Sequence, residues 1–197
     1  MEWEVIYKWL PKFIQGATLT LELVGIAVIL GLLLAIPLGI ARSSKLWYVR
    51  ALPYAYIFFF RGTPLLVQLF LVYYGLAQFD AVRDSFMWPY LRDPFWCATA
   101  TMTLHTAAYI AEILRGAIQA IPPGEIEAAR ALGMSRPKAL FYIILPRAAR
   151  IGLPAYSNEV ILMLKASSLA STVTLLELTG MARTIICLLY TSPSPRD

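Results

Sequence analysis

The chain contains little charge, histidine or cysteine. Only 15% of its 197 residues are charged, and it has one histidine and two cysteines. Soluble domains carry about 25% charged residues, so an ordinary soluble enzyme or a disordered chain is excluded. Two cysteines are too few for a disulfide framework. Because Cys97 and Cys187 lie in or beside apolar runs, we expect them to act as small hydrophobic side chains. No metal site is predicted.

Apolar residues dominate instead, at 59% of the sequence. A helix needs roughly 20 apolar residues to cross a bilayer. Four stretches qualify, and we predict an all-α polytopic membrane protein with spans at about residues 17–41, 54–78, 94–115 and 151–176. Pro37 is expected to kink the first span. A signal peptide is the alternative for this stretch, but its apolar run exceeds the usual 7–15 residues.

The basic residues orient these spans, because positive charge marks cytoplasmic loops. Nine basic residues fall on one side of the first three spans and four on the other. The first set is Arg42, Lys45, Arg50, Arg115, Arg130, Arg136, Lys138, Arg147 and Arg150, and the second is Lys8, Lys12, Arg83 and Arg92. We therefore expect the N-terminus and residues 80–93 outside and residues 119–150 in the cytoplasm. The net charge of +5 is explained by topology, without a nucleic-acid partner.

The long cytoplasmic segment predicts two short helices joined by a sharp corner. Pro122 and Pro123 suit the start of the first helix, and Gly133 suits the left-handed position after its end. Ser135 is placed to cap the second helix. Pro146 is expected to end or kink that helix where the fourth span begins. Composition alone also permits an alanine-rich, solvated loop helix.

The spacing within this segment resembles the EAA loop of ABC importer permeases. It reads EAA at residues 127–129, then three residues, Gly133, nine residues, Ile143, one residue, and Leu145 with Pro146. Three further stretches resemble the polar amino-acid branch of that family, closest to its histidine, glutamine and arginine type. They are FRGTPLLVQ at 60–68, AYIAE at 108–112 followed by Arg115 and Gly116, and PAYSNEVI at 154–161.

The resemblance implies a type I ABC importer permease core over residues 1–186, in a bacterial cytoplasmic (inner) membrane. It implies a translocation pathway for a polar amino acid, basic or amide, and no enzymatic activity in this chain. The expected partners are a dimer of ATP-binding subunits, a second permease subunit, an extracytoplasmic solute-binding protein and the lipid bilayer. Glu127, Ala128, Ala129 and Gly133 are then the contacts to the ATPase. The chain lacks G-x-x-x-x-G-K-[ST], so ATP and Mg²⁺ are expected on the partner ATPase and no cofactor on this chain.

Ionisable residues inside spans are costly and mark candidate pathway positions. Glu159 would pair with a substrate cation and Asn158 would offer a donor and an acceptor. Lys165 and Ser167 lie farther along the same span and would meet a carboxylate. Gln68 is a weaker candidate, with interhelical hydrogen bonding as its alternative. The structural alternative for Glu159 is a buried ion pair with Lys165.

Three other polar positions have mainly structural interpretations. Glu112 is a pathway candidate, but it stands three residues before Arg115 and can pair with it on one helix face. Arg61 interrupts the second span, where it would snorkel to headgroups, join an ion pair or contact substrate. His105 is expected to be an interhelical hydrogen-bonding residue.

Two other classes of function remain open. An intramembrane enzyme would have to use His105 with Ser157, Ser167 or Ser168, and no recognisable spacing supports that set. A passive small-solute channel would leave the small-faced cytoplasmic helix unexplained. Detection of an associated ATPase separates both from an importer subunit.

The end of the sequence departs from the family pattern. The family has a fifth span after about residue 186, whereas this chain continues as CLLYTSPSPRD at 187–197. Eleven residues are too short to cross a bilayer, and serine and proline disfavour a helix. We expect this tail to be non-native and the fifth span to be missing or replaced; a genuine short tail is the alternative.

Overall fold

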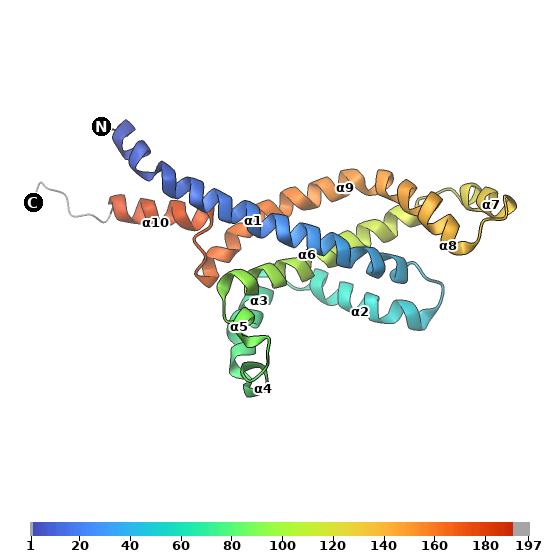
Figure 1. The fold of residues 1–197 in the computed structure, drawn as a ribbon, viewed down its shortest axis with the longest axis horizontal. Coiled ribbons are helices and arrows are strands. Elements are labelled where there is room, and N and C mark those ends of the chain that lie inside the picture. The colour runs from blue at the N-terminus through green and yellow to red at the C-terminus, as the bar shows by residue number, and fades with distance from the viewer. Residues whose placement is uncertain (1, 191–197) are drawn as a thin grey trace, which may run out of the picture. The chain divides into compact units, whose positions relative to one another are not determined.

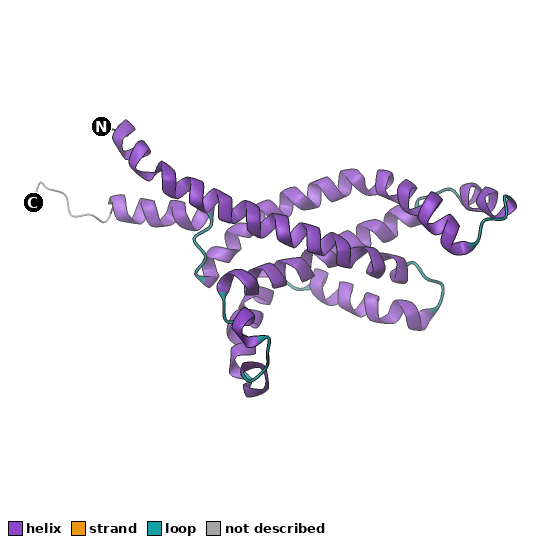
Figure 2. Cartoon of the chain, in the orientation of Figure 1, coloured by secondary structure: helices purple, strands orange, loops and turns teal. Residues whose placement is uncertain are grey.

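A computed structural model describes the backbone of residues 2–190 and the side-chain surroundings of residues 7–188. Within this part every regular element is a helix and no strand occurs, which confirms the all-α prediction (Figure 2). The elements, drawn in Figure 1, are α1 (Glu2–Arg42), α2 (Trp47–Gly62), α3 (Leu65–Phe70), η1 (Leu71–Gly75), η2 (Leu76–Gln78), α4 (Asp80–Arg83), α5 (Trp88–Leu91), α6 (Pro94–Gln119), α7 (Pro123–Ala131), α8 (Arg136–Ala139), η3 (Leu140–Ile144), α9 (Leu145–Ala166), η4 (Ser167–Val173) and α10 (Leu178–Tyr190).

The first predicted span lies within α1, an uninterrupted helix of 41 residues. Its stretch Tyr7–Arg42 is long and apolar enough to cross a membrane. Pro37 lies inside this helix, which continues past it to Arg42, and the kink expected there stays a prediction. Membrane helices tolerate such prolines because neighbouring groups satisfy the freed carbonyl.

The second predicted span, residues 54–78, is wrong as a single helix. α2 ends at Gly62, and Thr63 is extended, with φ −112° and ψ 140°. The residue before a proline is driven out of the helical region, and Thr63 precedes Pro64. The N–H and the hydroxyl of Thr63 both donate to the Phe59 carbonyl, at 3.1 and 2.8 Å, which closes the end of α2. The chain resumes as α3 and continues through a π-helical turn, η1.

The predicted number of four spans is not fully supported. In the described residues one helix has the length and composition of a span, or up to three if two bent helix pairs each count as one. The pairs are Trp47–Gly62 with Leu65–Gln78 and Arg136–Val173 with Leu178–Leu188. The third predicted span is one helix of 26 residues, α6, which is long enough to cross a membrane but not apolar enough to count among these spans. Its threonines and its charged residues Glu112 and Arg115 lower its mean hydropathy.

Close contacts divide the chain into two compact units. One contains the start of α1, the segment Leu65–Met102 and the chain after Met163. It includes α4 and α5, which lie within residues 80–93, the segment predicted as an outer loop. The other unit contains Val28–Pro64 and Thr103–Leu162.

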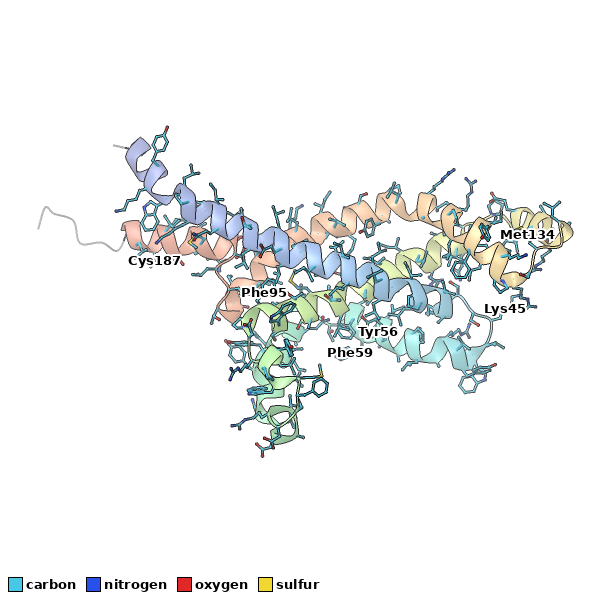
Figure 3. The ribbon with its side chains drawn as sticks, viewed as in Figure 1. Lys45, Tyr56, Phe59, Phe95, Met134 and Cys187 are labelled. Carbon is cyan, nitrogen blue, oxygen red and sulfur yellow. The ribbon has the colours of Figure 1, made fainter. Side chains whose placement is uncertain are left out.

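The second unit has an apolar core in which α1 and α6 approach closely. Ala35, Ala108 and Ala111 are fully buried there beside Ile57 of α2. A Cβ atom added to Gly39 would lie 3.0 Å from the Ala111 carbonyl oxygen. Tyr56, labelled in Figure 3, joins α2 to α6 by donating its hydroxyl to the Leu104 carbonyl at 2.5 Å. Small side chains thus let the helix backbones nearly touch, as is typical of membrane helix packing.

The first unit is organised around the start of α10. Glu177 is buried and accepts hydrogen bonds from the N–H groups of Thr179 and Gly180, at 2.8 and 2.7 Å. A carboxylate at this position satisfies free donors and complements the helix dipole. The Thr20 hydroxyl of α1 accepts a bond from the Leu178 N–H at 3.1 Å. These contacts join α10 to α1.

The predicted non-native tail does not begin with a helix break. α10 continues to Tyr190, so the helix includes the first four residues of the segment 187–197. Leucines 188 and 189 and Tyr190 are compatible with a helix, whereas the serines and prolines come later. Residues 191–197 lie outside the described part of the chain.

Candidate functional site

The two short helices predicted for residues 119–150 are confirmed as α7 and α8. α7 begins at Pro123, and Gly133 follows its end with a positive φ of 75°. The Met134 N–H donates to the Ala129 carbonyl at 3.1 Å and the Gly133 N–H to the Arg130 carbonyl at 2.9 Å. This pair of bonds is the Schellman arrangement, which requires a left-handed residue at the position of Gly133. Figure 3 labels Met134 in the resulting turn.

The second helix of this segment differs in detail from the prediction. Ser135 occupies the N-cap position of α8, but its side chain makes no capping hydrogen bond. Pro137 lies in the first turn. The helix does not end at Pro146. It passes through the π-helical turn η3 into α9, and Pro146 lies in the first turn of α9. A π-turn accommodates the carbonyl that a proline cannot pair with.

α7 is attached to the rest of its unit by one side. Ile126 packs against a cluster of Ala117, Ile121 and Ala148 from α6, the following turn and α9. The Glu125 carboxylate forms an ion pair with Arg147 of α9 at 3.3 Å. α7 also packs against α8 and η3. The EAA residues at 127–129 therefore lie on a helix that contacts both α6 and α9.

The four predicted coupling residues do not share one exposed face. Glu127, Ala128 and Gly133 are exposed, but Ala129 is only 4% exposed. Successive helix positions are about 100° apart, so Ala129 falls on the inner side of α7. We correct the sequence view here: Ala129 packs within its own chain and does not belong to the outward surface. That surface also includes Leu132, which is 82% exposed.

The second unit also contains Glu159, a predicted pathway residue. Glu159 of α9 is 6% exposed, whereas its neighbour Asn158 is exposed. The charge of Arg61 acts attractively on Glu159. The structure therefore supports an inward-facing carboxylate at the predicted position and places Asn158 on a different face of the helix.

Glu112 and Arg115 form the predicted pair on α6. The Arg115 Nε donates to Glu112 Oε1 at 2.8 Å, and Nη2 donates to the same oxygen. Arg42 and Arg61 also act attractively on Glu112. The Arg61 guanidinium lies over the ring of Tyr109 at 5.2 Å, so this exposed side chain has an aromatic partner, and its three predicted roles stay open. His105 also stacks on Tyr109, with ring centroids 4.9 Å apart.

The remaining predicted pathway residues belong to the other unit. Gln68 of α3 is 5% exposed, and α3 packs against η4. Ser167 of η4 is buried, but its hydroxyl donates to the Leu164 carbonyl at 2.7 Å. Lys165 is exposed. The structure thus brings α3, which contains Gln68, against η4, and the Ser167 hydroxyl donates to a carbonyl at the end of α9.

The other two serines considered for an intramembrane enzyme also donate their hydroxyls to backbone carbonyls of the preceding helical turn. The hydroxyls of Ser157 and Ser168 donate to the carbonyls of Leu153 and Lys165, both at 2.9 Å. A nucleophilic serine requires a base within hydrogen-bonding reach of this same hydroxyl. The described residues also contain no group of three histidine, cysteine or acidic side chains placed to hold a metal ion.

One cavity of the second unit was missed by the sequence analysis. It has a volume of about 310 Å³ between α1, α2 and α6. Its lining is Arg42, Tyr54, Ile57, Phe58, Arg61, Gly62, Tyr109 and Glu112. Part of the cavity lining could have been predicted from the sequence. Tyr54, Phe58 and Arg61 follow helical i, i+4, i+7 spacing and therefore share one face of α2. No local pattern links that face of α2 to Arg42, whose charge served in the sequence analysis only as an indicator of the cytoplasmic side.

Comparison with known proteins agrees with this architecture. Residues 27–186 match the family model described as binding-protein-dependent transport system inner membrane component. The octopine transport system permease protein of Rhizobium radiobacter is 52% identical over 92% of this chain and 74% of its own length. The histidine/lysine/arginine/ornithine transport system permease protein of Escherichia coli is 44% identical over 89% of this chain and 74% of its own length.

Solved structures share the fold. An amino acid ABC transporter crystallised with histidines superposes with a TM-score of 0.81 at 37% identity, covering 94% of this chain and 82% of that one. A methionine ABC transporter in an inward-facing conformation superposes with a TM-score of 0.70 at 19% identity, which speaks for the fold alone. The type I permease fold expected from the sequence is confirmed. The chain therefore belongs to the family of inner membrane components of binding-protein-dependent transport systems, and it is a permease subunit of an ABC importer.

Proposed function

We propose that this chain forms the translocation pathway of an ATP-driven importer for a polar amino acid with a cationic side chain. The observation that carries this proposal is the buried carboxylate of Glu159, which faces the interior of a membrane-embedded helical unit. A carboxylate in that position is costly unless it meets a cation. The names of the relatives support the choice, since one group transports histidine, lysine, arginine and ornithine.

The partners in this proposal follow from the coupling segment. A dimer of ATP-binding subunits would receive the exposed side of α7, where Glu127, Ala128 and Gly133 lie. These subunits would bind ATP and Mg²⁺. A second permease subunit would complete the pathway, and an extracytoplasmic binding protein would deliver the amino acid. Because α7 is anchored to α6 and α9, a movement of the ATPase would reach helices that carry Glu112 and Glu159.

The substrate assignment is tested by Glu159→Gln. This variant keeps the shape of the side chain and removes its charge. Loss of one cation contact in a partly wet site costs about 1–3 kcal/mol, which corresponds to roughly 5- to 150-fold weaker binding. We expect the half-saturating concentration for arginine uptake to rise by that factor in proteoliposomes containing the assembled transporter and saturating binding protein.

The matched control is Glu22→Gln, which removes an exposed carboxylate of α1. It should leave uptake unchanged. If Glu159→Gln and Glu22→Gln behave alike for every amino acid in a panel of cationic, amide and apolar substrates, Glu159 has a structural role. If the unaltered transporter imports none of these amino acids, the proposed function itself is wrong.

The membrane orientation in this proposal places the N-terminus and residues 80–93 outside and residues 119–150 in the cytoplasm. Single cysteines at positions 84 and 135 test it, because Asp84 and Ser135 are both exposed. Cys187 is exposed and should be replaced by serine to remove background labelling. In intact cells an impermeant maleimide should label position 84 and spare position 135. The reverse pattern would reject the orientation.

A further inference from the structure

The turn between α1 and α2 carries basic and aromatic side chains on its outer surface. Lys45, labelled in Figure 3, lies in this turn, and Arg50 lies in the first turn of α2. Both are exposed, and neither forms an ion pair within the described residues. Trp47 and Tyr48 lie between them, 72% and 61% exposed, with ring centroids 6.3 Å apart. Residues 23–79 include no acidic residue, so the positive charge of the turn is not offset by its neighbours in the sequence.

Hydrogen bonds and packing fix how this turn is presented. The N–H and the hydroxyl of Ser43 both donate to the Gly39 carbonyl, at 3.1 and 2.8 Å. The Leu46 N–H donates to the Ser44 hydroxyl at 3.2 Å, which leads the chain into α2. Ile57 is buried in the core with α1 and α6, so the opposite side of α2 faces outward.

The outward side of α2 continues from the aromatic pair as an apolar strip. Leu52, Phe58 and Phe59 are 79%, 70% and 51% exposed. Trp47 and Phe58 are 11 positions apart, which is about 16 Å along a helix that rises 1.5 Å per residue. One leaflet supplies about half of the hydrocarbon thickness of about 30 Å. The apolar strip is therefore as long as one acyl layer is deep.

The two parts of this surface match the two parts of an anionic phospholipid. Tryptophan and tyrosine are enriched at the boundary between headgroups and hydrocarbon, and lysine and arginine beside them attract anionic headgroups. A soluble partner would meet the cations and leave the apolar strip in hydrocarbon. A neighbouring transmembrane helix would cover the strip and leave the cations without a counter-charge. A phospholipid with a negative headgroup satisfies both.

We propose that this surface binds an anionic phospholipid of the adjoining leaflet, which is the cytoplasmic leaflet in the orientation proposed above. Lys45 and Arg50 bind the headgroup, Trp47 and Tyr48 lie at its boundary with hydrocarbon, and the acyl chains lie along the apolar strip. The contact does not depend on which amino acid is carried.

The test is quenching of Trp47 fluorescence by brominated lipids. The assembled transporter is placed in nanodiscs of phosphatidylcholine and phosphatidylglycerol, with one of the two brominated near the carbonyl end of its acyl chains. Subtracting the signal of Trp47→Phe isolates this tryptophan. Each basic residue near a membrane surface favours anionic lipid about fivefold, so phosphatidylglycerol should be preferred roughly 25-fold at equal mole fractions. Lys45→Gln should lower that preference about fivefold, and Lys45→Gln with Arg50→Gln should abolish it.

A matched control removes the same charge beside another tryptophan. Lys8 and Lys12 are exposed, and their ammonium groups lie 5.9 and 4.6 Å from the Trp9 ring. Lys8→Gln with Lys12→Gln should leave the lipid preference at Trp47 unchanged, whereas an equal loss would show an effect of net charge alone and overturn the site.

Two further outcomes overturn the proposal. Equal quenching by the two lipids shows that the headgroup is not selected. Absence of quenching at Trp47 shows that protein, either the ATPase or a second permease subunit, covers the surface. The fluorescence measurement requires no transport, so the importer assignment is judged separately by arginine uptake into proteoliposomes.

Discussion

Gly39 in α1 and Gly133 after α7 are both glycines for a physical reason, but the reasons differ. A Cβ atom at Gly39 would lie 3.0 Å from the Ala111 carbonyl oxygen and equally close to Leu114. A Cβ atom at Gly133 would meet nothing within 4 Å, yet its φ is 75°. The first glycine is needed for space between two membrane helices and the second for a backbone conformation in an open turn. The core region is constrained by packing, and the coupling region by local geometry.

The comparison predicts its largest effect at Gly39. Gly39→Leu forces the side chain against a backbone oxygen that cannot move without shifting α6, so we expect a loss of stability of about 3 kcal/mol, the upper end for overpacking. The midpoint of thermal unfolding of the purified protein in detergent measures this loss. Gly25→Leu is the matched control, because nothing lies within 4 Å of a Cβ at that position of α1. Equal midpoints for the two variants would contradict the packing argument.

Gly133→Val should have a smaller and more selective effect. A β-branched residue at positive φ costs about 1–3 kcal/mol and displaces the corner between α7 and α8. Because the open turn can relax by displacing the corner, the variant should insert and lose less thermal stability than Gly39→Leu, while ATP hydrolysis by the assembled transporter loses its dependence on loaded binding protein. Gly133→Asn is the control, since asparagine tolerates the left-handed region. Full coupling in the valine variant would show that the corner is not read by the ATPase.

The smallest effect is expected where α7 is attached to α9. The pair Glu125–Arg147 is about half exposed, with side-chain exposures of 33% and 48%, and such pairs contribute less than about 1 kcal/mol. Glu125→Gln should therefore lower coupled ATP hydrolysis only slightly, by less than Gly133→Val. A double-mutant cycle with Arg147→Gln, measured on the same ATPase activity, isolates the pair. A coupling energy near zero would leave Ile126 as the main anchor of α7.

Much of the coupling segment was predictable because its signals are local. Prolines before α7, the left-handed Gly133 and the position of Ser135 each follow from one or two neighbouring residues. The break between α2 and α3 was also encoded locally, in Gly62, Thr63 and Pro64. The continuous apolar run around these residues led instead to the prediction of one span over residues 54–78. The burial of Ala129 was not predictable from composition, since alanine suits either face of a helix.

By itself, the sequence determined the helical membrane class, the family and the two short helices around Gly133. The length of apolar stretches, the placement of charges and the spacing of motifs are all visible in the linear sequence, so they can be identified without a folded structure. Only the tertiary structure decided which polar atoms share a space. Arg42, Arg61 and Glu112 come from three helices and line one cavity, whereas the adjacent Asn158 and Glu159 face different surroundings. Which side chains from different helices meet depends on how each helix is rotated and packed, and the position of a residue in the sequence does not specify this.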